Sequence, residues 1–375
     1  MKNKSLLLVI LAVVILAGIY FLVSQKGEER FSGAPAVQTE PAIAGIELKR
    51  PLVVGLVSWP GYAGGIVANN GFAENRESTF YKKYGLLVKF VLIEDIDARG
   101  KAFVKGGPDG VDVVWSTVDF WSNEAPAYVE SGTSVKAFMQ VDWSRGGDAL
   151  VVNRDVKAVE DLRGKKIALV QYTPSHWLLE SLLAGSKLTV EDKDAIRKNL
   201  IFSQDTMSAR AAFTAGQADA TVVWEPDVSI ALAREGSYIL KSTKDYPNII
   251  ADVMVAKDDF LKTNPRTIEA FIRGFFDGVA QAEAQPEKAA RLLMENESLF
   301  AELGLEKTVQ SLSWVKWTGM EDNIKMFGLN GQPPLFDSVF TGSAQSWKAL
   351  GLIKEVLDPA SVKDDSYLRN VYAAQ

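Results

Sequence analysis

The sequence predicts an α/β protein built from two doubly wound α/β lobes, and three observations lead to this fold class. From residue 51 onwards, short apolar strand-like runs alternate with helix-like runs, the pattern of sheets covered by helices. One unit occurs twice, at Phe103–Trp115 and at Phe213–Trp224: a phenylalanine, a glycine turn, an aspartate and an apolar strand that ends in tryptophan. Two segments, 142–148 and 249–256, suit crossings between the lobes. We therefore expect two similar lobes with a cleft between them.

Composition excludes several classes of function. The chain has 375 residues, of which 47% are hydrophobic and 23% charged, enough for two or three folded domains. The net charge is −6, with no basic run beyond the N-terminus, which argues against nucleic acid as a partner. Cysteine is absent, so disulfides, thiol catalysis and a lipid-modified cysteine are excluded. His176 is the single histidine, so no multi-histidine metal site and no cofactor are expected.

The N-terminus predicts the compartment. Lys2 and Lys4 precede an uncharged apolar run at 6–23, longer than the ~7–15 residues of a signal-peptide core and close to the ~17–25 of a membrane-spanning helix. Because the basic residues come first, the rest of the chain is expected outside the cytoplasm. We interpret residues 1–23 as an uncleaved membrane anchor, with a removed signal peptide as the alternative, and residues 24–50 as a flexible tether.

The first lobe is predicted to comprise residues 51–145 and 254–375. Apolar, β-rich runs predict its strands at 52–58, 86–93, 111–115 and 135–142. In open parallel sheets, ligands bind outside the carboxyl ends of the strands. The binding candidates there are Trp59, Tyr62, Trp115, Ser116, Thr117 and Asp142. Packing in a turn is the alternative role for Tyr62, and capping of the next helix is an alternative or additional role for Ser116 and Thr117.

The second lobe is predicted at 146–253, with the strand at 249–256 leading back to the first. Its other strands are expected at 149–152, 166–170, 200–203, 220–223 and 238–241. Thr173 suits the N-cap and Pro174 the first position of a helix, whose free N–H groups suit an anion or a polar oxygen. The binding candidates of this lobe are Tyr172, Thr173, Ser175, His176, Trp224, Glu225 and Asp252. Packing is an equally good interpretation of His176.

The chain after Pro265 is predicted to be helical. Apolar residues recur at helical spacing from Ile268 to Val279, which indicates a helix packed on a core. Further helices are expected at 287–300, 306–317 and 340–353. Trp314 and Trp317 lie three apart in the second of these, and we interpret them as packing residues, with lining of the cleft as the alternative.

Several motifs together resemble a known family. The chain contains D-L-R-G-K-K-I-A-L at 161–169, T-P-S-H at 173–176 and A-R-A-A-F-T-A-G-Q-A-D-A-T-V-V-W-E-P at 209–226. L-G-L-I-K at 350–354 and D-D-S-Y-L at 364–368 follow near the C-terminus. As a set, they resemble the nitrate/sulfonate/taurine-type substrate-binding proteins of ABC transporters and the related thiamine-pyrimidine-precursor group, which have the type II periplasmic binding protein fold.

The resemblance implies an extracytoplasmic receptor that closes on a small solute and delivers it to an ABC permease. It implies ligand contacts at Trp59, Tyr62, Ser116, Thr117, Thr173, Ser175, Trp224 and Glu225. The chain departs from the family in lacking the lipobox cysteine, so its expected attachment to the cytoplasmic membrane, through the apolar N-terminal run, does not follow the family's pattern. It also lacks the cysteine-rich motif and the histidines of the enzymes in this superfamily that make the thiamine pyrimidine, so that activity is not expected.

The residue types at the expected cleft favour an amine-bearing or heterocyclic solute. Tryptophan faces bind cations with ~0.5–2 kcal/mol per contact. Arg145 is the one base expected nearby, against the acids Asp119, Asp142, Glu225 and Asp252. Sulfate-like anions are therefore expected to bind poorly. No enzyme activity is expected, because the sequence has no Ser-His-Asp order, metal cluster or phosphate loop. A membrane-anchored ligand sensor that works through a partner protein is the alternative to a transport receptor.

Overall fold

The computed structural model describes residues 45–374. The predicted anchor at 1–23 and most of the predicted tether at 24–50 lie outside this part of the chain. Within it, no helix combines the length and the apolar character that crossing a bilayer requires. The last residues of the predicted tether pack on the fold, because the Glu47 carboxylate accepts hydrogen bonds from the N–H and the hydroxyl of Thr267.

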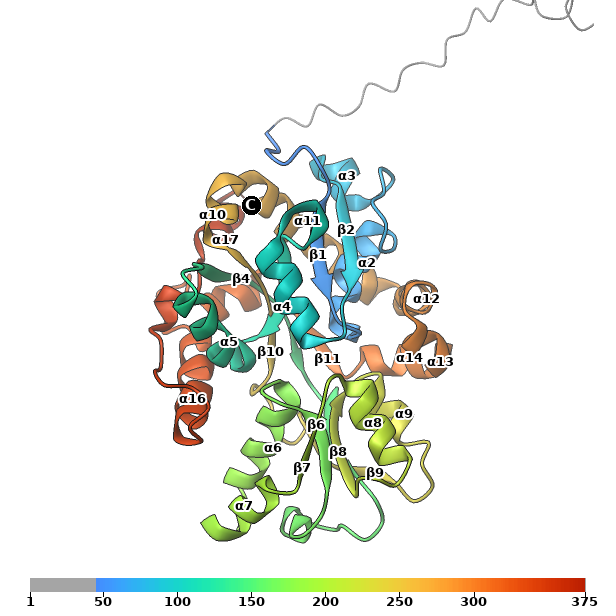
Figure 1. Cartoon of the computed structure of the whole chain (residues 1–375). Helices are drawn as coiled ribbons and strands as arrows, with labels where there is room; N and C mark the ends of the chain where they lie inside the picture. The colour runs from blue at the N-terminus through green and yellow to red at the C-terminus, as the bar shows by residue number, and fades with distance from the viewer. Residues whose placement is uncertain (1–44, 375) are drawn as a thin grey trace, which may run out of the picture. The chain divides into compact units, whose positions relative to one another are not determined.

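The first lobe is built on a six-stranded mixed sheet of order β11-β4-β10-β3-β1-β2 (Figure 1). Its strands are β1 (Leu52–Leu56), β2 (Val88–Leu92), β3 (Val113–Thr117), β4 (Val135–Ser144), β10 (Ala251–Lys257) and β11 (Val315–Trp317). β1 is parallel to β2 and β3, whereas β10 is antiparallel to β3 and β4. This register places Asp252 of β10 opposite both Thr117 of β3 and Asp142 of β4.

The second lobe is built on a five-stranded sheet of order β7-β6-β8-β5-β9. Its strands are β5 (Asp148–Val152), β6 (Ile167–Val170), β7 (Leu200–Ser203), β8 (Ala220–Trp224) and β9 (Tyr238–Ser242), and its helices are α6 (Pro174–Ala184), α7 (Val190–Arg197), α8 (Thr206–Thr214) and α9 (Asp227–Ala231). Leu150 and Val152 of β5 pack with α6 and α7, and Ala149 and Val151 pack with α8 and α9. Helices thus cover both faces of the sheet (Figure 1), and the predicted two-lobed α/β architecture is confirmed.

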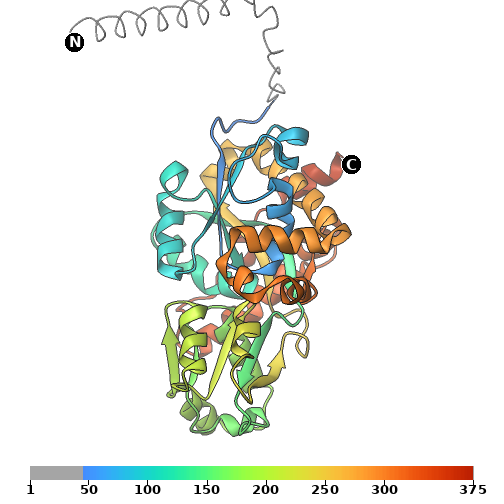
Figure 2. The ribbon, with the colours of Figure 1, turned by 90° about the vertical axis from the view of Figure 1, so that its right-hand side faces the viewer.

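Helices of the first lobe come from both ends of the described chain. They are α2 (Ala63–Asn69), α3 (Thr79–Tyr84), α4 (Ile96–Lys105), α5 (Val118–Glu130), α10 (Asp258–Thr263), α11 (Pro265–Ala284), α12 (Pro286–Asn296), α13 (Ser298–Leu303), α14 (Leu305–Leu312), α15 (Met320–Phe327), α16 (Leu335–Ala349) and α17 (Ser366–Ala373). α11 carries the predicted apolar stripe, and its Phe271 stacks on Phe80 of α3. Figure 2 shows the orange helices α12 to α14 beside the second lobe, where α13 contacts α9.

The chain crosses between the sheets twice. β4 ends at Ser144 and β5 begins at Asp148, so the first crossing contains Gly146, whose φ of +126° favours glycine, and Gly147. The second crossing joins the end of β9 to the start of β10. The lobe limits expected from the sequence, at 145/146 and 253/254, lie near these crossings and stay a prediction.

Two helix predictions are wrong. The helix expected at 306–317 ends at Leu312, and Val315–Trp317 form strand β11 instead, because the N–H groups of Arg145 and Gly147 in the crossing both donate to the Trp314 carbonyl. Pairing with a distant strand overrides the local helical pattern. The helix expected at 287–300 is divided into α12 and α13 at Glu297, whose backbone is extended.

Candidate functional site

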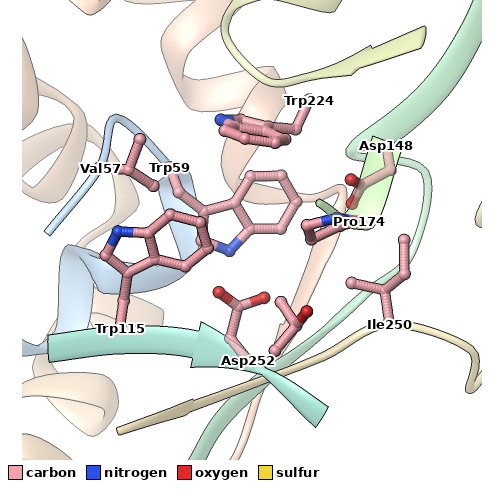
Figure 3. Close-up of a pocket in the computed structure, with 9 residues that line it drawn as sticks. Val57, Trp59, Trp115, Asp148, Pro174, Trp224, Ile250 and Asp252 are labelled. Atoms are coloured by element: carbon pink, nitrogen blue, oxygen red, sulfur yellow. The ribbon is translucent and has the colours of Figure 1, made fainter. Parts of the chain in front are cut away.

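A small cavity lies at the junction of the two lobes (Figure 3). Its walls come from both sheets, and the residues that line it are Val57, Trp59, Trp115, Thr117, Asp148, Pro174, Trp224, Ile250 and Asp252. The free volume is about 10 Å³, close to the room that one water molecule needs. The cavity therefore lies where the carboxyl ends of β1, β3 and β8 converge, the position at which α/β sheets bind ligands.

Three tryptophans form most of the cavity wall. Trp59 follows β1, Trp115 lies in β3 and Trp224 ends β8, and all three are buried. The rings of Trp115 and Trp224 meet edge to face across the two lobes, with centroids 6.0 Å apart and an interplanar angle of 68°. Such a pair contributes about 0.5–1.5 kcal/mol beyond the burial of its area. The repeated unit seen in the sequence thus supplies one tryptophan from each lobe to a single contact.

Two glycines allow Trp59 to reach its position. The Trp59 indole N–H donates to Asp142 Oδ2 at 2.9 Å. A Cβ atom on Gly61 would lie 1.7 Å from that carboxylate oxygen, and a Cβ atom on Gly147 would lie 2.4 Å from the Trp59 ring. Neither position has room for a side chain, so both the turn after β1 and the first crossing are shaped around this tryptophan.

Four buried aspartates surround the cavity. Asp252 and Asp142 are cross-strand neighbours on β10 and β4, and the Tyr62 hydroxyl donates to Asp252 Oδ1 at 2.5 Å. Asp148 opens β5 opposite Trp224 of β8. The fourth, in the first turn of α5, is Asp119.

Burial is the main influence on the acidity of these four groups. It raises the pKa of Asp142 to about 8 and that of Asp148 to about 7. Burial, followed by the charge of Asp142, raises the pKa of Asp252 well above its ordinary value, and burial does the same for Asp119. The cavity therefore favours either protonated carboxyl groups or a cation beside them.

Few positive charges balance these acids. None of the lining residues is lysine or arginine. The buried Arg99 guanidinium lies over the Trp115 ring at 4.8 Å, but it is occupied by the Trp115 carbonyl and by Glu124 at 2.5 Å. Arg145 donates to the Asn248 side chain instead. In the described part of the chain, no group of three or more histidine, aspartate or glutamate side chains is arranged to hold a metal ion.

Several buried polar atoms of the site have no hydrogen-bond partner among the described residues. They are the indole nitrogens of Trp115 and Trp224, Asp142 Oδ1, both carboxylate oxygens of Asp119, Glu225 Oε2 and the Ser175 hydroxyl. In Figure 3 the nitrogen of Trp224 lies at the end of the ring away from Asp148. Buried polar groups normally have partners. The site thus offers N–H donors at one end and carboxylates at the other.

The structure brings together about half of the residues predicted to bind ligand. Trp59, Trp115, Thr117, Trp224 and Asp252 line the cavity. Tyr62 and Asp142 lie directly behind them as hydrogen-bond partners. Thr117 also caps α5, since its hydroxyl oxygen accepts from the Phe120 N–H.

Ser116 points away from the cavity, because it lies in β3 between Trp115 and Thr117, which line the cavity, and successive strand residues face opposite sides. The Ser116 hydroxyl donates to Glu124 at 3.0 Å. Glu225 is fully buried, accepts from the Ser229 hydroxyl at 3.0 Å, and has a pKa that burial raises to about 8. Glu225 does not line the cavity, but its second carboxylate oxygen is buried without a hydrogen-bond partner among the described residues, so its role as a ligand contact stays a prediction.

The remaining candidates surround the start of α6. Thr173 was predicted to cap the helix, but its side chain makes no capping hydrogen bond. Its hydroxyl donates to the Val170 carbonyl instead. Ser175 is fully buried. His176 accepts the Tyr172 N–H at Nδ1 and packs against Trp347 of α16, and burial lowers its pKa. Tyr172 has a φ of +65° and lines a groove beside the cavity.

Four lining residues escaped the sequence-based prediction: Val57, Asp148, Pro174 and Ile250. Asp148 matters most, because it adds a carboxylate to the cavity. The sequence feature that could have identified Asp148 is its position at the start of a strand, directly after two glycines.

Known proteins are similar to parts of this chain. The family model described as "NMT1/THI5 like" matches residues 122–289. A putative aliphatic sulfonates-binding protein of Escherichia coli (strain K12) is 31% identical over 147 residues, which cover 39% of this chain and 44% of the relative. The taurine-binding periplasmic protein of the same strain is 27% identical over 155 residues, which cover 41% and 46%. The chain thus spans about half the length of the curated relatives that it matches.

Solved structures match almost the whole described part. The periplasmic aliphatic sulphonate binding protein SsuA from Escherichia coli aligns with a TM-score of 0.65 and 19% identity, covering 87% of this chain and all (100%) of that one. The periplasmic nitrate-binding protein NrtA from Synechocystis PCC 6803 aligns with a TM-score of 0.65 and 15% identity, covering 86% and 88%. The fold is that of periplasmic binding proteins. The resemblance to the nitrate/sulfonate/taurine-type proteins is confirmed by these matches.

Proposed function

We propose that this protein is the solute-binding receptor of an ABC import system, which closes on a small molecule and delivers it to a permease. The observation that carries the proposal is the cavity whose walls come from both lobes, with Trp115 on one side and Trp224 on the other. Relatives named as sulfonate- and taurine-binding proteins support it. In this proposal the apolar run at 6–23 anchors the receptor to the outer face of the cytoplasmic membrane.

The solute of this receptor carries a protonated amine or a cationic heterocycle. Support comes from the aspartates of the cavity, which have no basic partner among the lining residues. A cation beside a buried carboxylate offsets the cost of burying that charge. The free indole N–H groups of Trp115 and Trp224 favour an oxygen acceptor elsewhere on the same molecule. A zwitterion with an amine at one end meets both requirements, whereas an inorganic anion meets only the second.

Entry of the solute requires the two lobes to part. A cavity of about 10 Å³ has no room for an organic molecule, so the Trp115 and Trp224 rings must separate on binding. Gly146 and Gly147 in the first crossing are suited to absorb the backbone rotation.

Thermal denaturation of the full-length chain in detergent tests the proposal with a matched pair of ligands. Taurine and ethanesulfonate differ only in the amine. We expect taurine to stabilise the protein, by about 2.7 kcal/mol when its concentration is 100 times its dissociation constant. Ethanesulfonate, nitrate and sulfate are expected to give no comparable shift. Equal stabilisation by taurine and ethanesulfonate would contradict the amine preference, and stabilisation by neither these compounds nor other small amines would contradict the receptor proposal.

A further inference from the structure

The buried aspartates around the cavity have no basic side chain among the lining residues to neutralise them. None of the four is more than 4% exposed: Asp119, Asp142, Asp148 and Asp252. Removing one ionised carboxylate from water costs several kcal/mol unless a cation pairs with it. Because none of the lining residues is basic, these acids need either protons or a cation from outside.

Asp142 and Asp252 are the most closely coupled of these groups. They lie opposite each other on β4 and β10, where like charges destabilise a sheet. Two such carboxyl groups titrate as one unit and retain a proton between them. Trp59 and Tyr62 each donate one hydrogen bond to the pair, and Asp142 Oδ1 has no donor among the described residues. That buried oxygen suits either the retained proton or an N–H group of a ligand.

We propose that the amine of the solute binds in exchange for a proton of the Asp142–Asp252 pair, so that acidity on the outer side regulates affinity. The inference rests on the proposed function. The exchange is balanced: the singly protonated pair and an ammonium ion give the doubly ionised pair with the ammonium bound, and one proton leaves for water. The net charge of the cavity stays the same, so binding avoids the cost of adding an unpaired charge to a buried site.

Charged groups on the surrounding elements set the pH at which the exchange occurs. Asp148 of β5 and Asp119 of α5 add negative charge and favour retention of protons. Arg99 of α4 opposes them but is offset by Glu124. Burial raises the pKa of Asp142 to about 8 and that of Asp252 well above its ordinary value, so the pair retains at least one proton at neutral pH.

Calorimetry of the full-length chain in detergent tests the exchange, with taurine and ethanolamine as the amine probes. The heat of binding is measured at one pH in phosphate and in Tris, whose ionisation enthalpies differ. We expect about one proton to be released per amine bound, and an affinity that rises about tenfold from pH 6 to pH 7, as linkage to one proton requires. Amine binding whose heat does not depend on the buffer, with an affinity that does not depend on pH, would overturn the exchange and leave the proposed function intact.

A pair of variants and a ligand-free measurement complete the test. The double variant Asp142→Asn/Asp252→Asn is expected to abolish proton release, whereas Glu297→Gln, which changes a buried carboxyl group outside the cavity lining, is expected to retain it. Infrared spectroscopy of the free protein at pH 7 is expected to show a protonated carboxyl band that is weaker in the double variant, because the other buried acids, such as Glu225, are unchanged in it. If the band of the double variant is as strong as that of the wild type, the exchange is wrong, whichever solute the receptor binds.

Discussion

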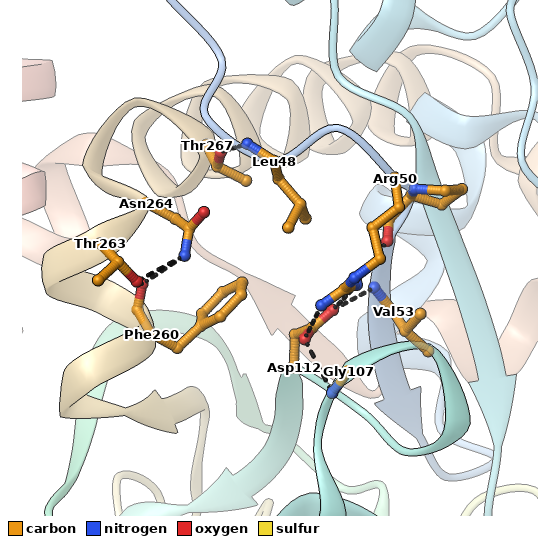
Figure 4. A network of polar contacts seen from close by, with 10 residues as sticks. Leu48, Arg50, Val53, Gly107, Asp112, Phe260, Thr263, Asn264 and Thr267 are labelled. Carbon is orange, nitrogen blue, oxygen red and sulfur yellow. Dashed lines mark hydrogen bonds and ion pairs between the residues drawn. The ribbon is translucent and has the colours of Figure 1, made fainter.

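Two buried aspartates of the first lobe, Asp112 and Asp142, differ in their partners. Asp112 accepts two hydrogen bonds from the Arg50 guanidinium, at 2.6 and 2.7 Å, and two more from the backbone N–H groups of Val53 and Gly107 (Figure 4). Asp142 accepts one, from the Trp59 indole. The first carboxylate is neutralised within the fold, and the second has an oxygen with no donor among the described residues.

This difference separates a structural acid from a binding acid. A carboxylate with a complete set of partners stabilises the fold and has nothing to offer a ligand. A buried carboxylate with an incomplete set costs stability, which is tolerated where a function requires it. Asp148 and Asp252 share the situation of Asp142, since burial raises the pKa of each. Substitutions at the two kinds of acid should therefore have opposite consequences.

The largest effect is expected for Asp112→Ala. The substitution leaves the Arg50 charge and the N–H groups of Val53 and Gly107 without their acceptor. We expect the free energy of unfolding to fall by about 2–4 kcal/mol, because two backbone N–H groups lose their buried acceptor and the Arg50 guanidinium, 30% exposed, loses its partner. Urea denaturation at pH 7 measures it. A loss below about 1 kcal/mol would remove the distinction between the two aspartates.

Gly61→Ala tests whether the position of the Asp142 side chain controls binding. The added Cβ atom would lie 1.7 Å from Asp142 Oδ2 and 2.3 Å from the Trp59 indole nitrogen, so the hydrogen bond between them cannot persist. We expect a loss of about 1–3 kcal/mol of stability through overpacking and at least about a tenfold loss of amine affinity, measured by denaturation and calorimetry.

Gly342→Ala in α16 is the matched control for this substitution, because a Cβ atom there meets nothing within 4 Å. It is expected to be neutral or stabilising by about 0.5–1 kcal/mol, as alanine is preferred in helices. If both glycine variants bind the amine like the wild type, the geometry around Asp142 does not control binding.

Sequence patterns predicted the parts of the site that depend on local structure. Trp59, Trp115 and Trp224 each follow or end an apolar strand, and the carboxyl ends of neighbouring strands meet at one edge. The alternation of strand side chains also places Ser116 on the face opposite Trp115 and Thr117.

The remaining features depend on pairing between distant segments. Asp148 reaches the cavity because β5 pairs antiparallel with β8 and places it opposite Trp224. Trp317 lies in a strand because β11 pairs with β4. No local pattern encodes either register, and this is why the sequence predicted the lobes and the tryptophans but missed an acid and misplaced a helix.

Asp142→Asn tests whether Asp142, unlike Asp112, is protonated in the folded state. Burial raises the pKa of Asp142 from 3.8 to about 8, so this group binds a proton in the folded state and not in the unfolded state between these values. Its contribution to stability is therefore lost as the pH rises towards about 8. The amide keeps an oxygen for the Trp59 N–H and has no charge to lose.

We expect the free energy of unfolding to fall more for the wild type than for Asp142→Asn between pH 6 and pH 9. The difference should be about 1.4 kcal/mol for each pH unit between pH 6 and the pKa of Asp142 in the folded state. Urea denaturation at the two pH values measures this difference. Parallel pH profiles for the two proteins would show that Asp142 is already ionised in the folded state.

The smallest effect is expected for a neutral contact between the same two lobes. Asn123 of α5 donates its side-chain N–H to the Tyr172 carbonyl at 2.9 Å, just before α6. A hydrogen bond of this kind contributes about 0.5–1.5 kcal/mol, and it is present only while the lobes are together. Asn123→Ala should therefore accelerate dissociation of the amine by about two- to tenfold and leave association almost unchanged.

Stopped-flow tryptophan fluorescence measures both rates. Because no titrating group is involved, the acceleration should be the same at pH 6 and pH 8. An acceleration that changed with pH would mean that the carboxyl groups of the cavity and the Asn123–Tyr172 hydrogen bond are coupled. The neutral contact between the lobes could then not be separated from the titrating aspartates.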